Sequence, residues 1–297
     1  MTAVMEVVLL GTGSPLYNPA RCGAGYVVIA GETQVVVDLG WGASRRINAA
    51  GLQQANVGHL CLTHMHSDHI TDVPDFLVQR WTGGATTPLR VFGPVGTRET
   101  VEAFHAALRL DVEYRVAHHG EDKLPRSGAE IDVTELSAAA TVAHVATIGD
   151  LVIESFEVDH FPVVPALGFR FRRHGRSLVF SGDTGKCDSL VEASRDADML
   201  ICEAMNQTMW DGLLGVVRTR NERGAAILSD VPSYHATTIE VAEMARDAGL
   251  KHLVLSHLLP MIPNEGPGLD AFTAGMSDIY GGKITVGSDL QRFSIET

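Results

Sequence analysis

Residues 63–69 read Thr63-His64-Met65-His66-Ser67-Asp68-His69, so three imidazoles and one carboxylate fall within six positions. An apolar run, Leu60-Cys61-Leu62, precedes this stretch, and the apolar residues after it repeat at helical spacing. The pattern predicts a buried strand, a loop and then a helix. The loop therefore presents its polar side chains from rigid supports, which is where a scaffold usually places chemistry.

The spacing of these four side chains suits metal ions. His64 and His66 are two positions apart, so their rings project to the same side of an extended segment. Asp68 and His69 follow where the chain turns into the helix, so they can serve a second ion. Imidazole with carboxylate favours zinc, with Mn²⁺, Fe²⁺ or Co²⁺ as substitutes. A polar surface cluster is the alternative, but four ligand-type side chains directly behind a buried strand favour a metal site.

Four further apolar segments are predicted to be strands, and each ends in a residue that can bind metal. The residues that follow these strands are Asp159-His160, Asp183, Glu203 and Ser256-His257. Strands of the parallel type place their carboxyl ends along one edge of a sheet, where ligands bind. Together with residues 63–69, these strand ends predict one shared metal site.

Three other features bear on the site. Asp38 ends a predicted strand, where its carboxylate can cap the next helix, hold a ligand histidine, or do both. Thr237-x-x-Glu240 is a capping box, and His235 stands just before the helix that it starts. Residues 205–232 are long for a connection and predict a short amphipathic helix. This helix is either a core or dimer-contact helix or a lid over the pocket, which Trp41, Trp81 and Trp210 could line.

Size and composition indicate one α/β domain spanning residues 1–297. The chain is 45% hydrophobic and no linker-like segment interrupts it. No apolar run reaches the roughly 18 residues of a membrane span. Residues 4–10 read as a first strand and not as a signal peptide. Four scattered cysteines without a Cys-x-x-Cys pair fit a reducing cytoplasm, so we expect a cytoplasmic protein that does not contact membrane.

The charge pattern argues against a nucleic-acid partner. Net charge is −13, and lysine occurs at only four positions. Such a surface does not attract phosphate backbones over its whole area. One basic group, Arg170, Arg172, Arg173 and Arg176, alternates with phenylalanines in a predicted hairpin. A solvated strand face is the favoured interpretation, and contact with an anionic substrate is the alternative.

Elsewhere the pattern predicts secondary structure only coarsely. Apolar spacing predicts a helix over residues 97–110 and irregular chain over 112–128. Residues 131–158 alternate as two or three antiparallel strands, and the last helix is expected at about 268–278.

The residues quoted above resemble the metallo-β-lactamase superfamily of binuclear metallohydrolases. The resemblance rests on His64-x-His66-x-Asp68-His69, His160, Asp183 and His257, and Asp38 matches the first acidic position of the family. Glu203 and His235-Ala236-Thr237 resemble elements of its ribonuclease Z and arylsulfatase-like branch. The resemblance implies an α/β fold, a four-layer αββα sandwich in which two mixed sheets carry helices on their outer faces.

The resemblance also implies a set of roles. One zinc ion is expected on His64, His66 and His160, and a second on Asp68, His69 and His257, with Asp183 bridging them. Asp68, His235 and Glu203 are the expected catalytic residues. Asp68 orients a water molecule that the two ions activate, and His235, supported by Glu203, stabilises the transition state or protonates the leaving oxygen. A structural His235 at a helix start is the alternative.

The resemblance leaves the substrate open, because the superfamily includes nucleases, phosphodiesterases, sulfatases, lactonases and thioesterases. Bacterial ribonuclease Z enzymes usually carry a long tRNA-gripping arm between the third and fourth metal motifs. Here those motifs are His160 and Asp183, 23 positions apart (183 − 160), and a predicted hairpin over 166–181 fills most of the gap. We therefore expect a binuclear zinc hydrolase acting on a small phosphodiester, aryl sulfate, ester or lactone.

Three other functions stay open at this point. They are an RNA- or DNA-processing nuclease of the ribonuclease Z type, a mononuclear iron dioxygenase on the same fold, and a non-catalytic metal-binding scaffold. The dioxygenase would not need Asp68 and His69 to complete a second site. Members of the branch are often homodimers, so a homodimer is a further expectation.

Overall fold

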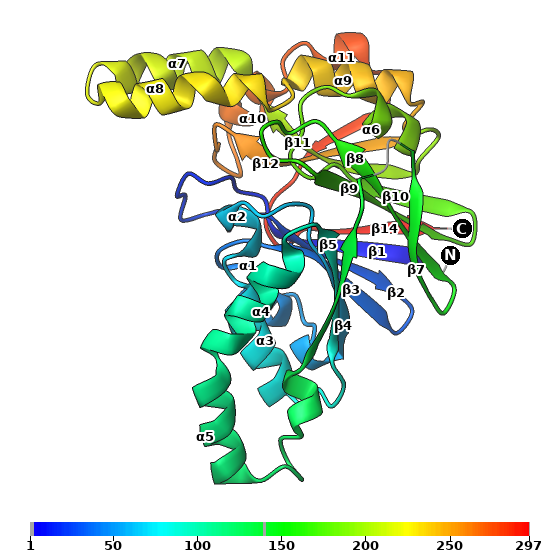
Figure 1. Ribbon diagram of the computed structural model, residues 1–297. Helices are drawn as coiled ribbons and strands as arrows, with labels where there is room; N and C mark the ends of the chain where they lie inside the picture. Colours follow the sequence, from blue (N-terminus) through cyan, green and yellow to red (C-terminus); the bar gives the residue numbers. More distant parts are fainter. Residues whose placement is uncertain (1–2, 139–140, 297) are drawn as a thin grey trace.

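The computed structural model describes residues 3–138 and 141–296. In this part of the chain the strands form two sheets of seven strands each, and helices cover the outer faces of both (Figure 1). The layers follow the order helix, sheet, sheet, helix. The predicted αββα sandwich with two mixed sheets is therefore confirmed.

The first sheet combines the N-terminal half of the chain with its last strand. Its spatial order is β14 (Arg292–Glu296), β1 (Ala3–Gly11), β2 (Gly25–Ala30), β3 (Thr33–Leu39), β4 (Val57–Cys61), β5 (Leu89–Pro94) and β6 (Ile131–Leu136). Strands β3, β4, β5 and β6 run parallel to one another. Their carboxyl ends therefore share one edge, and the loop at residues 62–66 leaves β4 at that edge.

The second sheet is built from the C-terminal half of the chain. Its spatial order is β13 (Lys283–Val286), β12 (His252–Leu259), β11 (Met199–Met205), β10 (Arg176–Phe180), β9 (Ala166–Arg173), β8 (Leu151–Val158) and β7 (Ala143–Ile148). Strands β10 to β13 are parallel, and β8 and β10 are both antiparallel to β9. The carboxyl ends of β8, β10, β11 and β12 thus meet at one edge, as the sequence predicted.

Hydrophobic clusters separate the four layers. Val7 and Val28 of the first sheet share the central cluster with Phe169, Phe171 and Phe180 of the second. A second cluster joins the outer face of the first sheet to helices, and a third does so for the second sheet. A core shared by both sheets supports the one-domain organisation, which stays a prediction.

Helices on the first sheet precede residue 120, and those on the second follow residue 187 (Figure 1). The first set is α1 (Ala43–Ala49), α2 (Ser67–Ile70), α3 (Val73–Thr82), α4 (Thr97–Ala107) and α5 (Arg109–His119). The second set is α6 (Asp188–Ala193), α7 (Gln207–Arg218), α8 (Glu222–Asp230), α9 (Thr238–Asp247), α10 (Pro267–Phe272) and α11 (Met276–Ile279). The predicted capping box of Thr237 and Glu240 starts α9.

The coarse predictions were wrong in several places. Residues 109–119 form helix α5, where the sequence suggested irregular chain from residue 112. Ion pairs four residues apart, such as Arg109–Glu113, support α5 without an apolar repeat. Strand β6 pairs in parallel with β5 and does not join β7. The last predicted helix is split into α10 and α11, because Gly275 takes a left-handed conformation with φ 82°.

Residues 205–232 hold two helices where one was expected. Asn206 caps α7 and Asn221 caps α8, because each side chain accepts a hydrogen bond from a backbone N–H three residues ahead. The second asparagine breaks the segment into an antiparallel α7–α8 hairpin that projects from the body of the molecule (Figure 1).

The basic strand residues form ion pairs. Arg170 and Arg172 both contact the carboxylate of Glu154, and Arg173 contacts Asp150. This arrangement confirms the interpretation that these arginines lie on the face of a strand. In the described part of the chain, no helix combines the length and apolar character needed to cross a bilayer.

Candidate metal centre

The loop between β4 and α2 is shaped by Asp38 at the end of β3. One oxygen of Asp38 accepts from the backbone N–H of Thr63 at 2.8 Å, and the other accepts from the Thr63 hydroxyl and from His69 Nδ1, each at 2.8 Å. Asp38 does not cap α1, whose first turn follows Gly42 without a side-chain cap. Of its two predicted roles, holding a ligand-type histidine is the one that the structure has.

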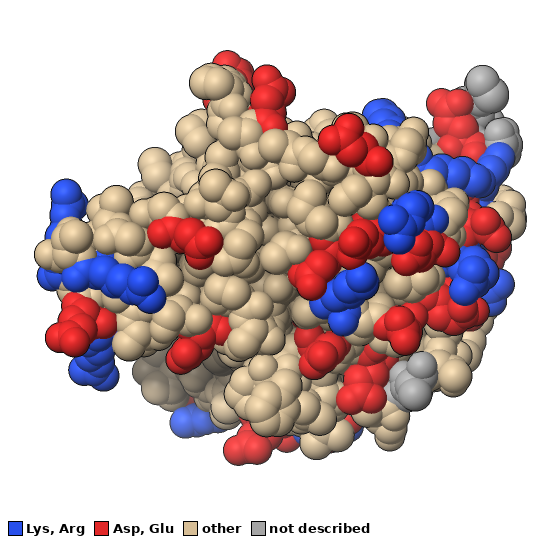
Figure 2. All heavy atoms as spheres, turned by 90° about the horizontal axis from the view of Figure 1, so that it is seen from above, with Lys and Arg blue, Asp and Glu red and all other residues tan. Residues whose placement is uncertain are grey.

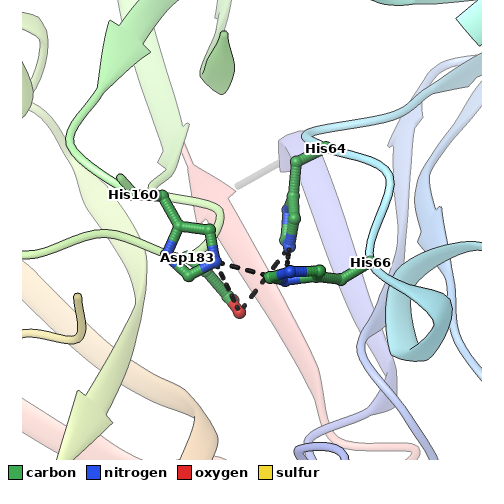
Figure 3. Close-up of side chains that lie close together, drawn as sticks. All are labelled: His64, His66, His160 and Asp183. Atoms are coloured by element: carbon green, nitrogen blue, oxygen red, sulfur yellow. Dashed lines mark hydrogen bonds and ion pairs between the residues drawn. The ribbon is translucent and has the colours of Figure 1, made fainter. Parts of the chain in front are cut away.

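Four ligand-type side chains converge in a first group: His64, His66, His160 and Asp183 (Figure 3). His64 Nε2 lies 3.0 Å from His66 Nδ1, which lies 3.2 Å from His160 Nε2. Asp183 Oδ2 is 3.8 Å from His64 Nε2 and 4.0 Å from His160 Nε2. The two loop histidines come from the first sheet, and the other two residues come from the second.

A second group contains Asp68, His69, Asp183 and His257, all of them buried. His257 Nε2 lies 3.1 Å from Asp68 Oδ2 and 3.3 Å from Asp183 Oδ2. His69 Nε2 lies 3.3 Å from Asp183 Oδ1. Asp183 therefore belongs to both groups and stands between them, as the seven-residue prediction requires.

The chemistry of these donors fits metal ions. His69 Nε2 and Asp183 Oδ1 are buried and have no hydrogen-bond partner among the described residues. Buried polar atoms are normally satisfied, so such orphans imply a missing partner. Burial lowers the pKa of His64 well below its ordinary value and that of His160 to about 4. Both rings are thus neutral near pH 7, which is the form that binds metal.

Two histidines are oriented by acceptors behind them. His69 donates from Nδ1 to Asp38, and His160 donates from Nδ1 to the backbone carbonyl of Tyr234 at 3.0 Å. In each ring this leaves the Nε2 lone pair directed at the cluster. The sequence pattern could not identify the Tyr234 carbonyl, because a backbone acceptor leaves no residue-type signal.

Two residues of the site also have a strained backbone. Asp38 and His257 adopt left-handed conformations, with φ of 54° and 45°. Residues other than glycine rarely do so, and such strain persists where surrounding contacts enforce it. At both positions the enforced backbone delivers a side chain that belongs to the cluster or supports it.

Glu203 and His235 form a buried pair beside the second group. His235 Nδ1 lies 2.6 Å from Glu203 Oε2, and the His235 ring stacks on that of His257 at 5.7 Å. Burial raises the pKa of Glu203 well above its ordinary value, and burial lowers the pKa of His235. These opposite shifts favour a neutral pair in which Glu203 carries the proton, and perturbed pKa values of this kind are typical of groups that exchange protons.

An apolar pocket of about 300 Å³ opens on the cluster. Its walls include His66, Asp183 and His235 of the site together with the apolar side chains of Trp210, Ile227 and Leu259. Of the three tryptophans expected to line such a wall, only Trp210 does. Trp81 is buried elsewhere and donates to the carbonyl of Pro125, while Trp41 packs on Tyr17.

Comparison with known sequences identifies the family. The sequence profile of the beta-lactamase superfamily domain matches residues 33–258. A ribonuclease Z of Mycobacterium bovis is 35% identical over 296 residues, which cover 98% of this chain and 99% of that protein. A ribonuclease Z of Mycobacterium sp. strain KMS is 36% identical over 295 residues, which cover 98% of this chain and 96% of that protein.

Solved structures show the same fold. Human tRNase Z, short form, superimposes with a TM-score of 0.70 at 20% identity, over 98% of this chain and 100% of that one. The expectation of a metal-dependent hydrolase is confirmed by these likenesses and by the His/Asp cluster. The chain belongs to the metallo-β-lactamase superfamily, in its ribonuclease Z-like branch.

Proposed function

We propose that this protein is a ribonuclease of the ribonuclease Z type, which hydrolyses a phosphodiester bond at the 3′ end of a tRNA precursor. The observation that carries the proposal is the position of Asp183 between two groups of ligand-type side chains, all of them buried except His66, with the Glu203–His235 pair alongside. The likeness to mycobacterial ribonuclease Z over nearly the whole chain supports it. This reverses the order of the two readings that the sequence alone suggested.

The short gap between His160 and Asp183 does not count against a ribonuclease. Strands β9 and β10 fill that gap, so it holds no long arm. However, the 296-residue alignment already covers 98% of this chain, which leaves no space for a long insertion in the Mycobacterium bovis protein either. A protein named ribonuclease Z can therefore lack such an insertion.

The metal set is part of the proposal. His64, His66 and His160 would hold one ion, Asp68, His69 and His257 a second, and Asp183 both, with zinc favoured by the donor set. Two ions held there would supply Lewis-acid stabilisation of the phosphate oxygens and would lower the pKa of a water molecule. A complete second group argues against the mononuclear dioxygenase, and the predicted homodimer stays a prediction.

The remaining steps fall to side chains of this protein. Asp68 would orient the attacking water from within the second group. With a proton on Glu203, His235 Nδ1 accepts a hydrogen bond and Nε2 keeps its hydrogen. His235 lines the pocket, so this hydrogen can be donated to the leaving oxygen. Glu203 would thus hold His235 in place and pass a proton to its Nδ1, without touching the substrate.

The test is cleavage of a tRNA transcript that carries a 3′ trailer, with Mn²⁺ or Zn²⁺ supplied and metal content measured on the same sample. We expect a single cut between the tRNA body and the trailer, and no cut with His257→Ala. A protein that holds its metal and leaves the transcript intact while hydrolysing a small ester would overturn the proposal.

One observation favours a second candidate, a hydrolase of small aromatic phosphodiesters or aryl sulfates. The apolar wall of Trp210, Ile227 and Leu259 would accept an aryl group as readily as a nucleobase. A chromogenic panel of phosphodiester, sulfate, carboxylic ester, lactone and β-lactam separates the two candidates. The small-substrate reading requires kcat/KM on a panel member to exceed that on the transcript.

A further inference from the structure

The α7–α8 hairpin carries an unusual concentration of unpaired positive charge at its tip. Residues 218–223 contain three arginines and one glutamate, a formal charge of +2 in a chain of net charge −13. Arg218, Arg220 and Arg223 are exposed and form no ion pair with the carboxylate of any described residue. Figure 2 shows Lys and Arg side chains gathered at the end of this projection.

The other projection has the opposite character. Helix α5 also extends away from the sheets (Figure 1), but residues 109–123 contain three Lys or Arg and four Asp or Glu, a formal charge of −1. Its arginines are neutralised, because Arg109 pairs with Glu113 and Arg115 with Asp111. Residues 207–230 of the α7–α8 hairpin sum to a formal charge of 0, so it is the tip of this hairpin, with its unpaired arginines, that would attract a polyanion.

The base of the hairpin forms part of the catalytic pocket. Trp210 of α7 packs with Met205, Val231 and Leu259, and its indole N–H donates to the carbonyl of Leu228 in α8. Ile227, although 60% exposed, lines the pocket that also contains His66 and Asp183. The base of the hairpin is therefore packed firmly beside the cluster, and its two helices extend away from the cluster.

The tip arginines do not all face the same way. Residues four apart on a helix are neighbours on one face, so Arg223 lies on the face of Ile227, one turn nearer the tip. Arg218 instead lines a separate groove with Glu222, Ala225, Ala226 and Ser229 of α8, and Arg223 does not line that groove. Arg223 is thus the tip arginine that an RNA entering the pocket would pass.

We propose that the α7–α8 hairpin is the RNA-holding arm of this protein and that Arg223 binds a backbone phosphate near the scissile bond. The inference rests on the proposed ribonuclease function and adds the binding surface that the missing insertion would otherwise supply. From Val231 at the pocket to Arg223 the helix rises about 12 Å, at roughly 1.5 Å per residue. A phosphate bound by Arg223 would therefore lie several nucleotides from the cut.

The test measures binding of the metal-loaded protein to a fluorescent, 3′-extended tRNA transcript over a range of KCl concentrations, with a non-hydrolysable linkage at the cut site so that no cleavage occurs. Replacing one phosphate contact should reduce the slope of log K against log [salt] by about 0.7–0.9. At 0.1 M salt this corresponds to a roughly fivefold to eightfold loss of affinity. We expect this result for Arg223→Ala, and no change of slope for Arg218→Ala, which removes the same charge from the other side of the hairpin.

Three results would overturn the inference. Equal losses of RNA affinity in both variants would mean that only the overall charge of the hairpin matters. An unchanged salt slope in Arg223→Ala would show that Arg223 binds no phosphate. A change of sedimentation mass in Arg223→Glu would make the hairpin an interface between copies of the chain. Failure of the ribonuclease proposal is distinct, because the unmodified protein supplied with metal would then leave the transcript uncut.

Discussion

Replacing Asp38 with Asn tests the idea that a residue outside the ligand set controls the second metal group. The side chains have almost the same size, and the Asn carbonyl oxygen can still accept from Thr63 N–H. However, the Asn amide now presents N–H groups to His69 Nδ1, where the carboxylate accepted a hydrogen bond at 2.8 Å. His69 must then accept at Nδ1 and carry its proton on Nε2, the atom that faces Asp183 at 3.3 Å.

The size of the effect follows from that change of tautomer. A protonated Nε2 cannot bind an ion, and losing the partner behind a ligand histidine typically lowers metal affinity by about 10–100-fold. That factor corresponds to about 1.4–2.8 kcal/mol. Asp38 touches the first group only indirectly, through the Thr63 hydroxyl, which donates to Asp38 and lies 3.0 Å from His64 Nδ1. The affinity of the first group should therefore fall less than that of the second. Asp38→Asn should therefore give a protein that binds one metal ion tightly and the other weakly.

The assay is a competition titration with a chromogenic chelator, followed by elemental analysis of the dialysed protein. Asp72→Asn is a matched control, because Asp72 accepts from the Ser44 N–H and belongs to neither group. We expect about two equivalents in the unmodified protein and the control, and close to one in Asp38→Asn. Two equally tight equivalents in Asp38→Asn would refute the tautomer argument, and loss of both would show that Asp38 supports the whole loop.

Three further predictions follow from the same structure. His235→Ala should slow turnover while metal content holds, because its ring adjoins the groups without belonging to the seven ligand residues; loss of metal on elemental analysis would contradict this. Removing metal by dialysis against a chelator should lower the Tm in calorimetry, because ions that bind only the folded state stabilise it. Burial raises the pKa of Glu154, but hydrogen bonds from Arg170 and Arg172 leave it lowered overall. A lowered pKa stabilises the fold above the unfolded value of roughly 4.3, so Glu154→Gln should cost about 1 kcal/mol in denaturant unfolding at pH 7 and much less near pH 3.

The sequence was informative where function depends on residue type and strand order. The convergence of the seven candidate ligand residues could be predicted because each follows an apolar run, and strand direction alone brings His160, Asp183 and His257 to one edge. The α7–α8 hairpin could not be predicted in the same way. Its division depends on Asn221 accepting from the Gly224 N–H, a local cap within a segment whose apolar spacing also fits a single helix.

The sequence ranked a small substrate above RNA for a related physical reason. Net charge describes the whole surface, whereas RNA binding depends on where unpaired cations stand. Most arginines here are neutralised in place, as Arg170 and Arg172 are by Glu154, and ion pairing of this kind cannot be read from composition. A chain of charge −13 can thus still carry unpaired arginines on a hairpin whose base adjoins the candidate metal centre. If replacing Arg223 and its neighbours leaves RNA affinity unchanged, the acidic composition again argues against an RNA substrate. A small substrate then becomes the better explanation.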